Sequence, residues 1–281
     1  MFFSSCSCFS SASTNVVSID AAAGVGGAKA YDLALCDEAA MLRLSQILTL
    51  LHVVKRLTRV FLVGDKHQAA PLVHSPIVKR TMLANGALEA FLGAGAPEAT
   101  ITEQHRMPRD RATALGMRVY GAPFTSSAAV AEDSMLIWRR LTTSMEPRGT
   151  SFVNVAEAQW AVGLCKSVKK SKVGSLAVFT YYAAPAALVE ELLGTESGVD
   201  VLTVAKVQGS EWDRIILLTT TNKPGRFVLD QRSAVVGFSR DKRGIAASAV
   251  EEFVTGTPAG RSFLDCLHTE NLAQDVQMAP L

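Results

Sequence analysis

Residues 33–41 read LALCDEAAM, and this stretch decides the fold class. An apolar run ends abruptly in two adjacent carboxylates, Asp37 and Glu38, and small residues follow. A short run that is apolar throughout is typical of a strand covered on both faces, as in parallel sheets. Ligands of open α/β sheets bind beyond the carboxyl ends of such strands. The stretch therefore predicts an α/β protein with two acidic side chains at a ligand-binding edge.

The segments on either side continue the alternation of strands and helices that an α/β fold requires. The pattern loosens over residues 121–150, where Gly, Pro and Ser are frequent, and then restarts. Strands are predicted at 14–20, 32–38, 59–65, 175–182, 199–209, 213–221 and 245–250, and helices at 40–52, 78–93, 155–169 and 184–194. The predicted organisation is an unstructured start over 1–13, a first domain over 14–125, a junction over 126–150, a second domain over 151–268 and a tail over 269–281.

The composition is that of a globular protein with a real core, since 48% of the 281 residues are hydrophobic and 19% are charged. A net charge of +2 and a pI near 8.3 suit a nucleic-acid partner without demanding one. The five cysteines are dispersed, which argues against a disulfide framework and for a reducing, intracellular compartment, cytoplasm or nucleus. No stretch approaches the roughly 18 apolar residues of a transmembrane helix, so no membrane contact is expected.

Four further motifs carry chemistry-bearing side chains. In GDKHQ (64–68), Gly64 permits a tight exit from a strand, and Gln68 follows four residues later. In QHRMP (104–108), the guanidinium of Arg106 suits bidentate contact with phosphate. VQGSEW (207–212) and GFSRDK (237–242) follow in the second half, and the latter places Arg240 where an arginine finger would stand. Taken singly, QHRMP and GFSRDK are more simply interpreted as solvated basic loops, and GDKHQ is also compatible with an ordinary strand-end turn.

The five motifs occur in one fixed order, and this order resembles that of the superfamily 1 helicases, especially the Upf1-like or DNA2/NAM7 group. CDEAA resembles motif II, the Walker B strand end of P-loop NTPases, and VGDKHQAAP resembles motif III. QHRMP is similar to the element that brings the motif IV arginine, VQGSEWDRIIL to motif V, and GFSRDK to motif VI. The resemblance runs from about residue 14 to 268, and the wording of motif V is also similar to nidovirus-type helicases.

The resemblance implies two RecA-like α/β domains with parallel sheets facing each other across an ATP cleft. It implies that Asp37 binds Mg²⁺ through water, that Glu38 is the catalytic base and that Gln68 senses the γ-phosphate. Arg106 and Arg240 would grip that phosphate from the two sides of the cleft. The resemblance further implies that His105 stacks on adenine and that Gly209 allows the backbone to approach the nucleotide closely. It implies that Glu211 lies at the ribose.

One part of the family pattern is missing from the sequence. GVGGAK (24–29) is the only stretch similar to a Walker A loop, but no Ser or Thr follows Lys29 and the stretch lies only eight residues before Asp37. The first domain is therefore expected to be N-terminally truncated, less stable than the second, and open along an apolar edge at the VFLVGD strand or a neighbour. Ala205, Val235 and Gly237 also replace the family's usual Asp, Asn and Ala.

The function implied by the resemblance is ATP-dependent unwinding of, or translocation on, single-stranded RNA or DNA, with ATP and Mg²⁺ as cofactors. Without a Walker A loop, the isolated chain is expected to be inactive. The alternatives are a non-enzymatic helicase-like module that binds nucleic acid or a protein partner, and a fragment of a viral polyprotein helicase. The basic clusters along the chain are expected to be solvated faces, and the sequence singles out no residue that contacts nucleic acid.

Overall fold

The chain divides into two compact units, Met1–Thr100 and Ile101–Leu281. The computed structural model describes residues 5–9, 14–18, 31–68, 70–71, 75, 77, 81, 86–131, 135–149, 151–170, 174–194, 197–221, 228–267 and 272–273. The division differs from the predicted junction over 126–150. The difference arises because the segment that carries QHRMP, and a strand that follows it, pack with the second half of the chain.

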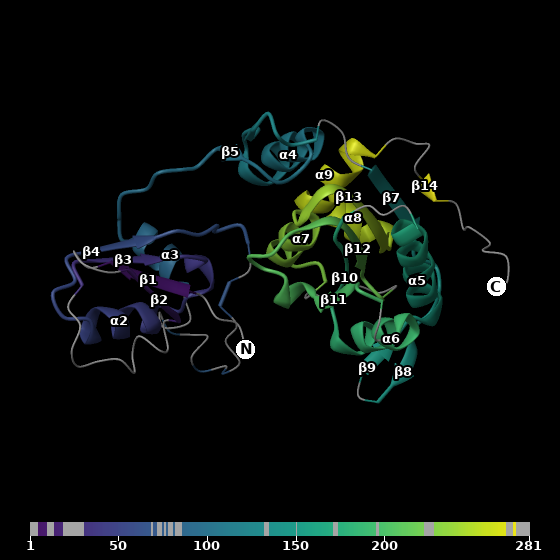
Figure 1. Ribbon diagram of the computed structural model, residues 1–281, viewed down its shortest axis with the longest axis horizontal. Helices are drawn as coiled ribbons and strands as arrows, with labels where there is room; N and C mark the ends of the chain where they lie inside the picture. The colour runs from purple at the N-terminus through teal and green to yellow at the C-terminus, as the bar shows by residue number, and fades with distance from the viewer. Residues whose placement is uncertain are drawn as a thin grey trace. The chain divides into compact units, whose positions relative to one another are not determined.

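The first unit is built on a four-stranded sheet in the order β2-β1-β3-β4 (Figure 1). Its elements are β1 (Ser5–Phe9), β2 (Thr14–Ser18), β3 (Leu33–Cys36), a 3₁₀ turn (Ala39–Met41), α2 (Leu44–Val53), β4 (Arg59–Leu62) and α3 (Ala87–Gly93). The pair β3–β4 is parallel, as predicted, but β1 is antiparallel to both β2 and β3, so this sheet is mixed. The expectation of an unstructured start over 1–13 was wrong for β1, whose SCSCF alternation is the period-two pattern of a strand.

The outer strand of this sheet presents apolar side chains to solvent. Among the described residues, β4 pairs with β3 alone, and its side chains alternate between exposed and half-buried. Phe61 is 53% exposed, and Val63, just beyond the strand, is 41% exposed. The expected open apolar edge at VFLVGD is therefore present in the part of the unit that the structure describes.

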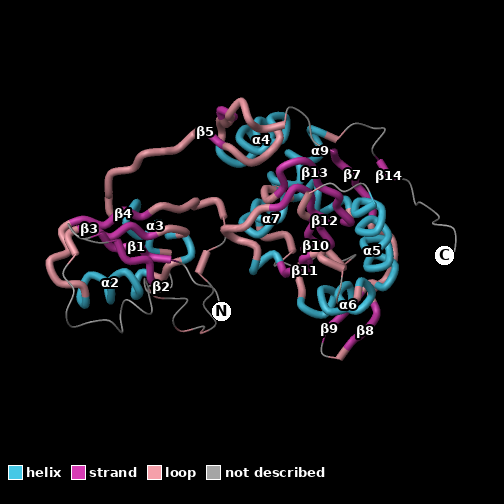
Figure 2. Tube along the Cα trace, viewed as in Figure 1, coloured by secondary structure: helices cyan, strands magenta, loops and turns pink. Residues whose placement is uncertain are grey.

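The second unit is built on a six-stranded sheet in the order β11-β10-β12-β13-β7-β14, whose strands are labelled in Figure 2. Every neighbouring pair of these strands is parallel. Its strands are β7 (Met135–Arg140), β10 (Leu176–Thr180), β11 (Asp200–Thr203), β12 (Trp212–Leu218), β13 (Asp241–Ala249) and β14 (Leu272–Ala273). Its helices are α4 (Arg109–Leu115), α5 (Val155–Lys170), α6 (Ala183–Leu193), α7 (Gln231–Phe238), α8 (Glu251–Gly256) and α9 (Pro258–Cys266). The α/β fold with a parallel sheet is thus confirmed.

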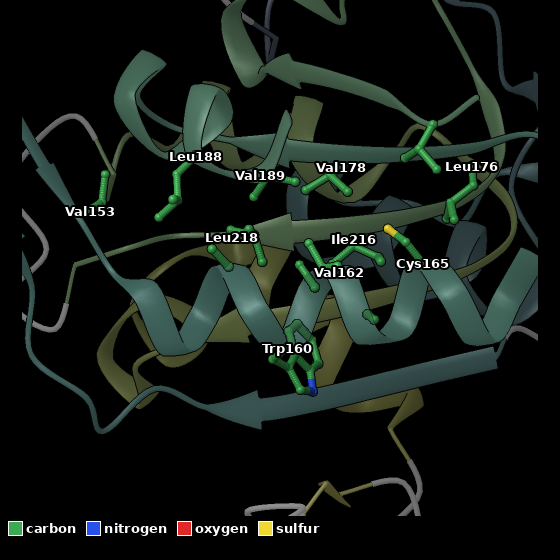
Figure 3. Packing of buried hydrophobic residues seen from close by; sticks show 14 residues of the cluster. Val153, Trp160, Val162, Cys165, Leu176, Val178, Leu188, Val189, Ile216 and Leu218 are labelled. Atoms are coloured by element: carbon green, nitrogen blue, oxygen red, sulfur yellow. The ribbon is translucent and has the colours of Figure 1, made fainter. Parts of the chain in front are cut away.

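Helices cover both faces of this sheet, which explains why all five residues of β10 are buried. On one face, Val162 and Cys165 of α5 lie beside Ile216 of β12 in a continuous apolar cluster (Figure 3). On the other face, α7 packs on β12 so closely that a Cβ added at Gly237 would lie 3.4 Å from a methyl carbon of Leu217. The alternate side chains of each strand therefore enter two separate cores.

Several smaller elements complete the second unit and depart from the predictions. They are β5 (Glu103–Gln104), a π-helical turn (Gly116–Tyr120), β6 (Thr125–Ser126), β8 (Glu146–Arg148), β9 (Ser151–Val153) and a 3₁₀ turn (Val204–Lys206). The strand expected over 199–209 ends at Thr203, β7 lies inside the predicted junction, and β14 lies inside the predicted tail. Among the described residues, no helix is long and apolar enough to cross a membrane.

Candidate functional site

In the first unit, the two carboxylates of CDEAA lie on a tight turn directly after β3. Asp37 is exposed and Glu38 is half-buried, and Glu38 adopts the left-handed conformation with φ of 50°. The backbone N–H of Glu38 donates to Oδ1 of Asp37 over 2.9 Å, which holds that carboxylate over the strand end. Both side chains thus stand at the carboxyl edge of β3, as the sequence predicts.

The turn after β4 packs closely against this acidic turn through backbone contacts. The N–H of Ala39 donates to the carbonyl of Val63 over 2.8 Å. A Cβ at Gly64 would lie 2.8 Å from the backbone nitrogen of Ala40 and 2.9 Å from that of Ala39, so only glycine fits. Gln68 follows on the same turn, and its Nε2 donates to Oδ2 of Asp65 over 2.8 Å. The first unit therefore brings Asp37, Glu38 and Gln68 to one edge of its sheet.

This edge is chemically suited to Mg²⁺ held mainly by water and phosphate. Mg²⁺ retains several waters and commonly takes only one or two protein carboxylates in nucleotide sites. Asp37 is an accessible carboxylate of that kind, and within the described part of the chain no group of three His, Cys, Asp or Glu residues forms an all-protein cage. The accessible carboxylate of Asp37 therefore fits a water-mediated Mg²⁺.

In the second unit, Gln104 organises the QHRMP loop. Its Oε1 accepts hydrogen bonds from the backbone N–H groups of Arg106 at 2.9 Å and Met107 at 2.8 Å. Its Nε2 donates to the carbonyl of Met107 and to the hydroxyl of Ser126. The side chain of His105 points outward, is 69% exposed, and lies 3.7 Å from a carboxylate oxygen of Glu103. Glutamine at this position is therefore the scaffold that presents His105 and Arg106.

Arg106 reaches the residue that precedes β12. Its Nε donates to Oε2 of Glu211 over 2.9 Å, and Lys242 of β13 lies 2.5 Å from the other oxygen of the same carboxylate. Hydrogen bonds from Lys242 and then Arg106 hold the pKa of Glu211 below its usual range, so this carboxylate stays ionised. Gly209, two residues earlier, has φ of 77°, a conformation that glycine adopts without strain.

Arg240 lies at the same end of the sheet but is turned inward. Only 2% of its surface is exposed, and its carbonyl accepts from the N–H of Trp212 over 3.0 Å. This burial differs from the accessible arginine finger that the sequence predicts at Arg240. The candidate residues of the second unit lie at the amino ends of β12 and β13, whereas those of the first unit lie at the carboxyl ends of β3 and β4.

The expectation that Arg106 and Arg240 come from two different domains was wrong. Both belong to the second unit, because α4, which begins three residues after Arg106, is anchored there. Fully buried Arg111 of α4 pairs with fully buried Asp241 of β13 at 3.3 Å and also donates to the carbonyl of Phe238. The sequence analysis missed Arg111, whose only signal is a basic residue on the inward face of a short helix.

Residues 83–248, more than half of the chain, match the family AAA_12, described as an AAA domain. The crystal structure of arterivirus nonstructural protein 10, a helicase, aligns with a TM-score of 0.45 and 14% identity over 79% of this chain and 40% of that one. Its complex with DNA aligns with a TM-score of 0.46 and 15% identity, over 80% of this chain and 41% of that one.

The C-terminal domain of a possible DNA helicase from Lactobacillus plantarum WCFS1 aligns with a TM-score of 0.36 and 11% identity, over 59% of this chain and 95% of that one. No curated protein matches the chain. This chain spans about two fifths of the arterivirus helicase chains.

A parallel sheet with helices on both faces is the architecture of an α/β protein of the RecA-like class. The family match is more specific. The chain belongs to the AAA_12 family, of the Upf1-like group of superfamily 1 helicases.

Proposed function

We propose that this chain forms part of an ATP-dependent helicase or translocase that acts on single-stranded RNA or DNA. The observation that carries this proposal is the contact between Arg106 and Glu211, which joins two motifs 105 residues apart in sequence at one accessible edge. A guanidinium and a carboxylate placed beside a glycine-bearing turn offer matched partners for a phosphate and a ribose hydroxyl. Family membership supports the helicase class.

In the second unit, the proposed roles follow from exposure and chemistry. Arg106 binds a phosphate of ATP, and Glu211 accepts a hydrogen bond from the ribose. The exposed imidazole of His105 stacks on the adenine ring, and Gly209 lets the backbone approach the nucleotide. Arg240 serves the terminal phosphate only after its buried side chain turns outward.

In the first unit, the acidic edge supplies the groups for hydrolysis. Asp37 would hold Mg²⁺ through water, and the metal would neutralise phosphate charge. Glu38 accepts the proton of the attacking water, and Gln68 orients that water or the γ-phosphate. Residues 24–29, which lie outside the described residues, do not supply the Lys-Ser/Thr pair of a Walker A loop, because no Ser or Thr follows Lys29. We therefore propose negligible ATP hydrolysis by the 281-residue chain alone.

The test measures two quantities on the purified chain. Binding of short single-stranded RNA and DNA is expected and should weaken as salt rises, because phosphate contacts release counterions. ATP hydrolysis with and without the oligonucleotides is expected to stay at background. Robust nucleic-acid-stimulated hydrolysis would refute the predicted inactivity, and absence of any nucleic-acid binding would refute the proposed helicase or translocase function.

A second candidate function is a non-enzymatic module that binds nucleic acid or a protein partner. The inward position of Arg240 favours it, because a catalytic arginine must reach the phosphate. The two candidates differ in their response to Mg²⁺ and ATP. Nucleotide-dependent change in oligonucleotide affinity supports a helicase cycle, whereas affinity that ignores the nucleotide supports the binding module.

A further inference from the structure

One carboxylate in the second unit is held by two cations from different elements. Glu211 precedes β12, Arg106 lies on the QHRMP loop and Lys242 lies in β13. Each cation contacts a different oxygen of the carboxylate, at 2.9 Å and 2.5 Å. The side chains of the three residues are 33%, 40% and 41% exposed for Arg106, Glu211 and Lys242 respectively. The cluster is therefore an oxyanion bound between two cations at an accessible surface.

Glu211 is the carboxylate that both Arg106 and Lys242 contact. Asp213 also lies nearby, but it accepts hydrogen bonds from the backbone N–H and hydroxyl of Ser175 at 2.7 Å and 2.9 Å. Its remaining oxygen lies 3.6 Å from Arg243. Arg106 has one further contact, from a terminal guanidinium nitrogen to the carbonyl of Ser239 at 3.4 Å. That neutral contact fixes the arginine in place without neutralising it.

Another anion can readily displace the carboxylate from ion pairs as exposed as these. Surface ion pairs contribute little free energy because water and salt screen them. A phosphate carries more charge than a carboxylate and offers three acceptor oxygens, so it competes well for a guanidinium and an ammonium that already face a common point. Displaced Glu211 then becomes available as an acceptor for a hydroxyl.

We propose that Glu211 occupies a polyphosphate site in this structure, and that Lys242 is a second phosphate-binding cation beside Arg106. This inference rests on the proposed nucleotide function and deepens it by assigning Lys242 and an intramolecular competitor. The ligand class is a polyphosphate, free or as the tail of a nucleoside triphosphate. Binding exchanges the Glu211 carboxylate for phosphate oxygens and frees the carboxylate for the ribose.

The experiment measures the affinity of inorganic tripolyphosphate for the full chain by calorimetry. Glu211→Gln removes the competing charge and keeps the side-chain size, so the affinity of this variant for tripolyphosphate is expected to rise roughly two- to fivefold, the equivalent of a surface ion pair. Lys242→Met is expected to lower affinity by a similar factor, and Lys242→Arg to restore most of it. Lys166→Met, an exposed lysine of α5, is the matched control and is expected to change nothing.

Two results would overturn the inference. Equal tripolyphosphate affinity of the wild-type chain and Glu211→Gln shows that Glu211 does not compete. Equal losses in Lys242→Met and Lys166→Met show diffuse attraction by positive charge in place of a site. Either result leaves the proposed function standing if the wild-type chain binds nucleic acid in a nucleotide-dependent manner, so the two failures are distinguishable. Circular dichroism of each variant confirms that it is folded.

Discussion

At the residue scale, the ion pair of Arg111 and Asp241 joins α4 to β13. Both side chains are fully buried, and Arg111 also lies over the ring of Phe263, 6.0 Å from its centroid. Burial raises the pKa of Asp241, and Arg111 opposes that effect. Asp241 lies between Arg240 and Lys242, so the pair also determines where the cations of the candidate site stand.

Breaking this pair is expected to destabilise the second unit strongly. Arg111→Met leaves Asp241 buried without its partner, which typically costs about 3–5 kcal/mol of unfolding free energy. The double variant Arg111→Met/Asp241→Leu is expected to recover much of that loss, because no isolated charge remains buried. Urea unfolding of the full chain measures both.

The matched control is the pair of Arg118 and Asp265, whose side chains are 46% and 39% exposed. Its removal is expected to leave the unfolding midpoint almost unchanged, since exposed ion pairs contribute little. Additive losses in the Arg111 and Asp241 variants would contradict the interpretation of a coupled pair.

Glu157 is a second buried charge, in the first turn of α5. Burial raises its pKa to about 7, although the backbone N–H of Thr220 donates to its carboxylate over 3.1 Å. The folded state thus holds a proton that the unfolded state releases near 4.5. Stability from this group is fully present below pH 4.5 and is lost as pH rises through about 7.

Glu157→Gln is expected to remove this pH dependence. The loss of unfolding free energy between about pH 5 and pH 8 amounts to about 3 kcal/mol in the wild-type chain, at ~1.4 kcal/mol per pKa unit. The glutamine keeps an acceptor for Thr220 and carries no charge, so its profile is expected to be flatter over that range. Denaturant unfolding across this pH range measures the difference, and parallel profiles would exclude Glu157 as the source.

At the scale of elements, the two turns after β3 and β4 behave as one structure. Gly64→Ala introduces a Cβ less than 3.0 Å from the backbone of Ala39 and Ala40, so the acidic turn must shift. Overpacking of this kind typically costs about 1–3 kcal/mol. We expect loss of stability in the first unit together with weaker Mg²⁺-dependent nucleotide binding.

Gly93→Ala is the matched control for that variant. Nothing lies within 4 Å of a Cβ at Gly93, which ends α3. Alanine there is expected to be neutral or to stabilise by up to about 1 kcal/mol. Hydrogen exchange of residues 33–41 in both variants measures the effect, and equal protection would contradict the close packing.

At the scale of the whole molecule, the two units differ in how completely their sheets are covered. Strand β10 of the second unit is buried along its full length, whereas β4 of the first unit has no fully buried residue. Hydrogen exchange is therefore expected to show weaker protection over residues 32–65 than over 175–218, because burial sets the free energy of local opening. Equal protection of the two segments would contradict a less stable first unit.

Much of the fold could be predicted because its signals are local. Uninterrupted apolar runs identified β3, β10 and β12, and the acidic turn after β3 followed from the order of residues alone. Strands β1 and β7 were not predicted because their sequence signals are weak. Strand β1 is short and Ser/Cys-rich, and β7 carries two arginines at its end and lies in a polar stretch. The predicted helix over 78–93 is described only as Ala87–Gly93.

The sequence by itself determined the α/β class, the family and the identity of the candidate groups, since each depends on residue type and order along the chain. Only the tertiary structure decided which groups share a unit, because long-range packing has no local signature. Arg106 and Arg240 lie in the same unit through the buried contact of Arg111 with Asp241, 130 residues apart in the sequence. Tertiary contacts likewise pair Glu211 with Lys242 and bury Arg240. Which of the basic side chains are accessible is therefore decided by the tertiary structure and not by the order of residues.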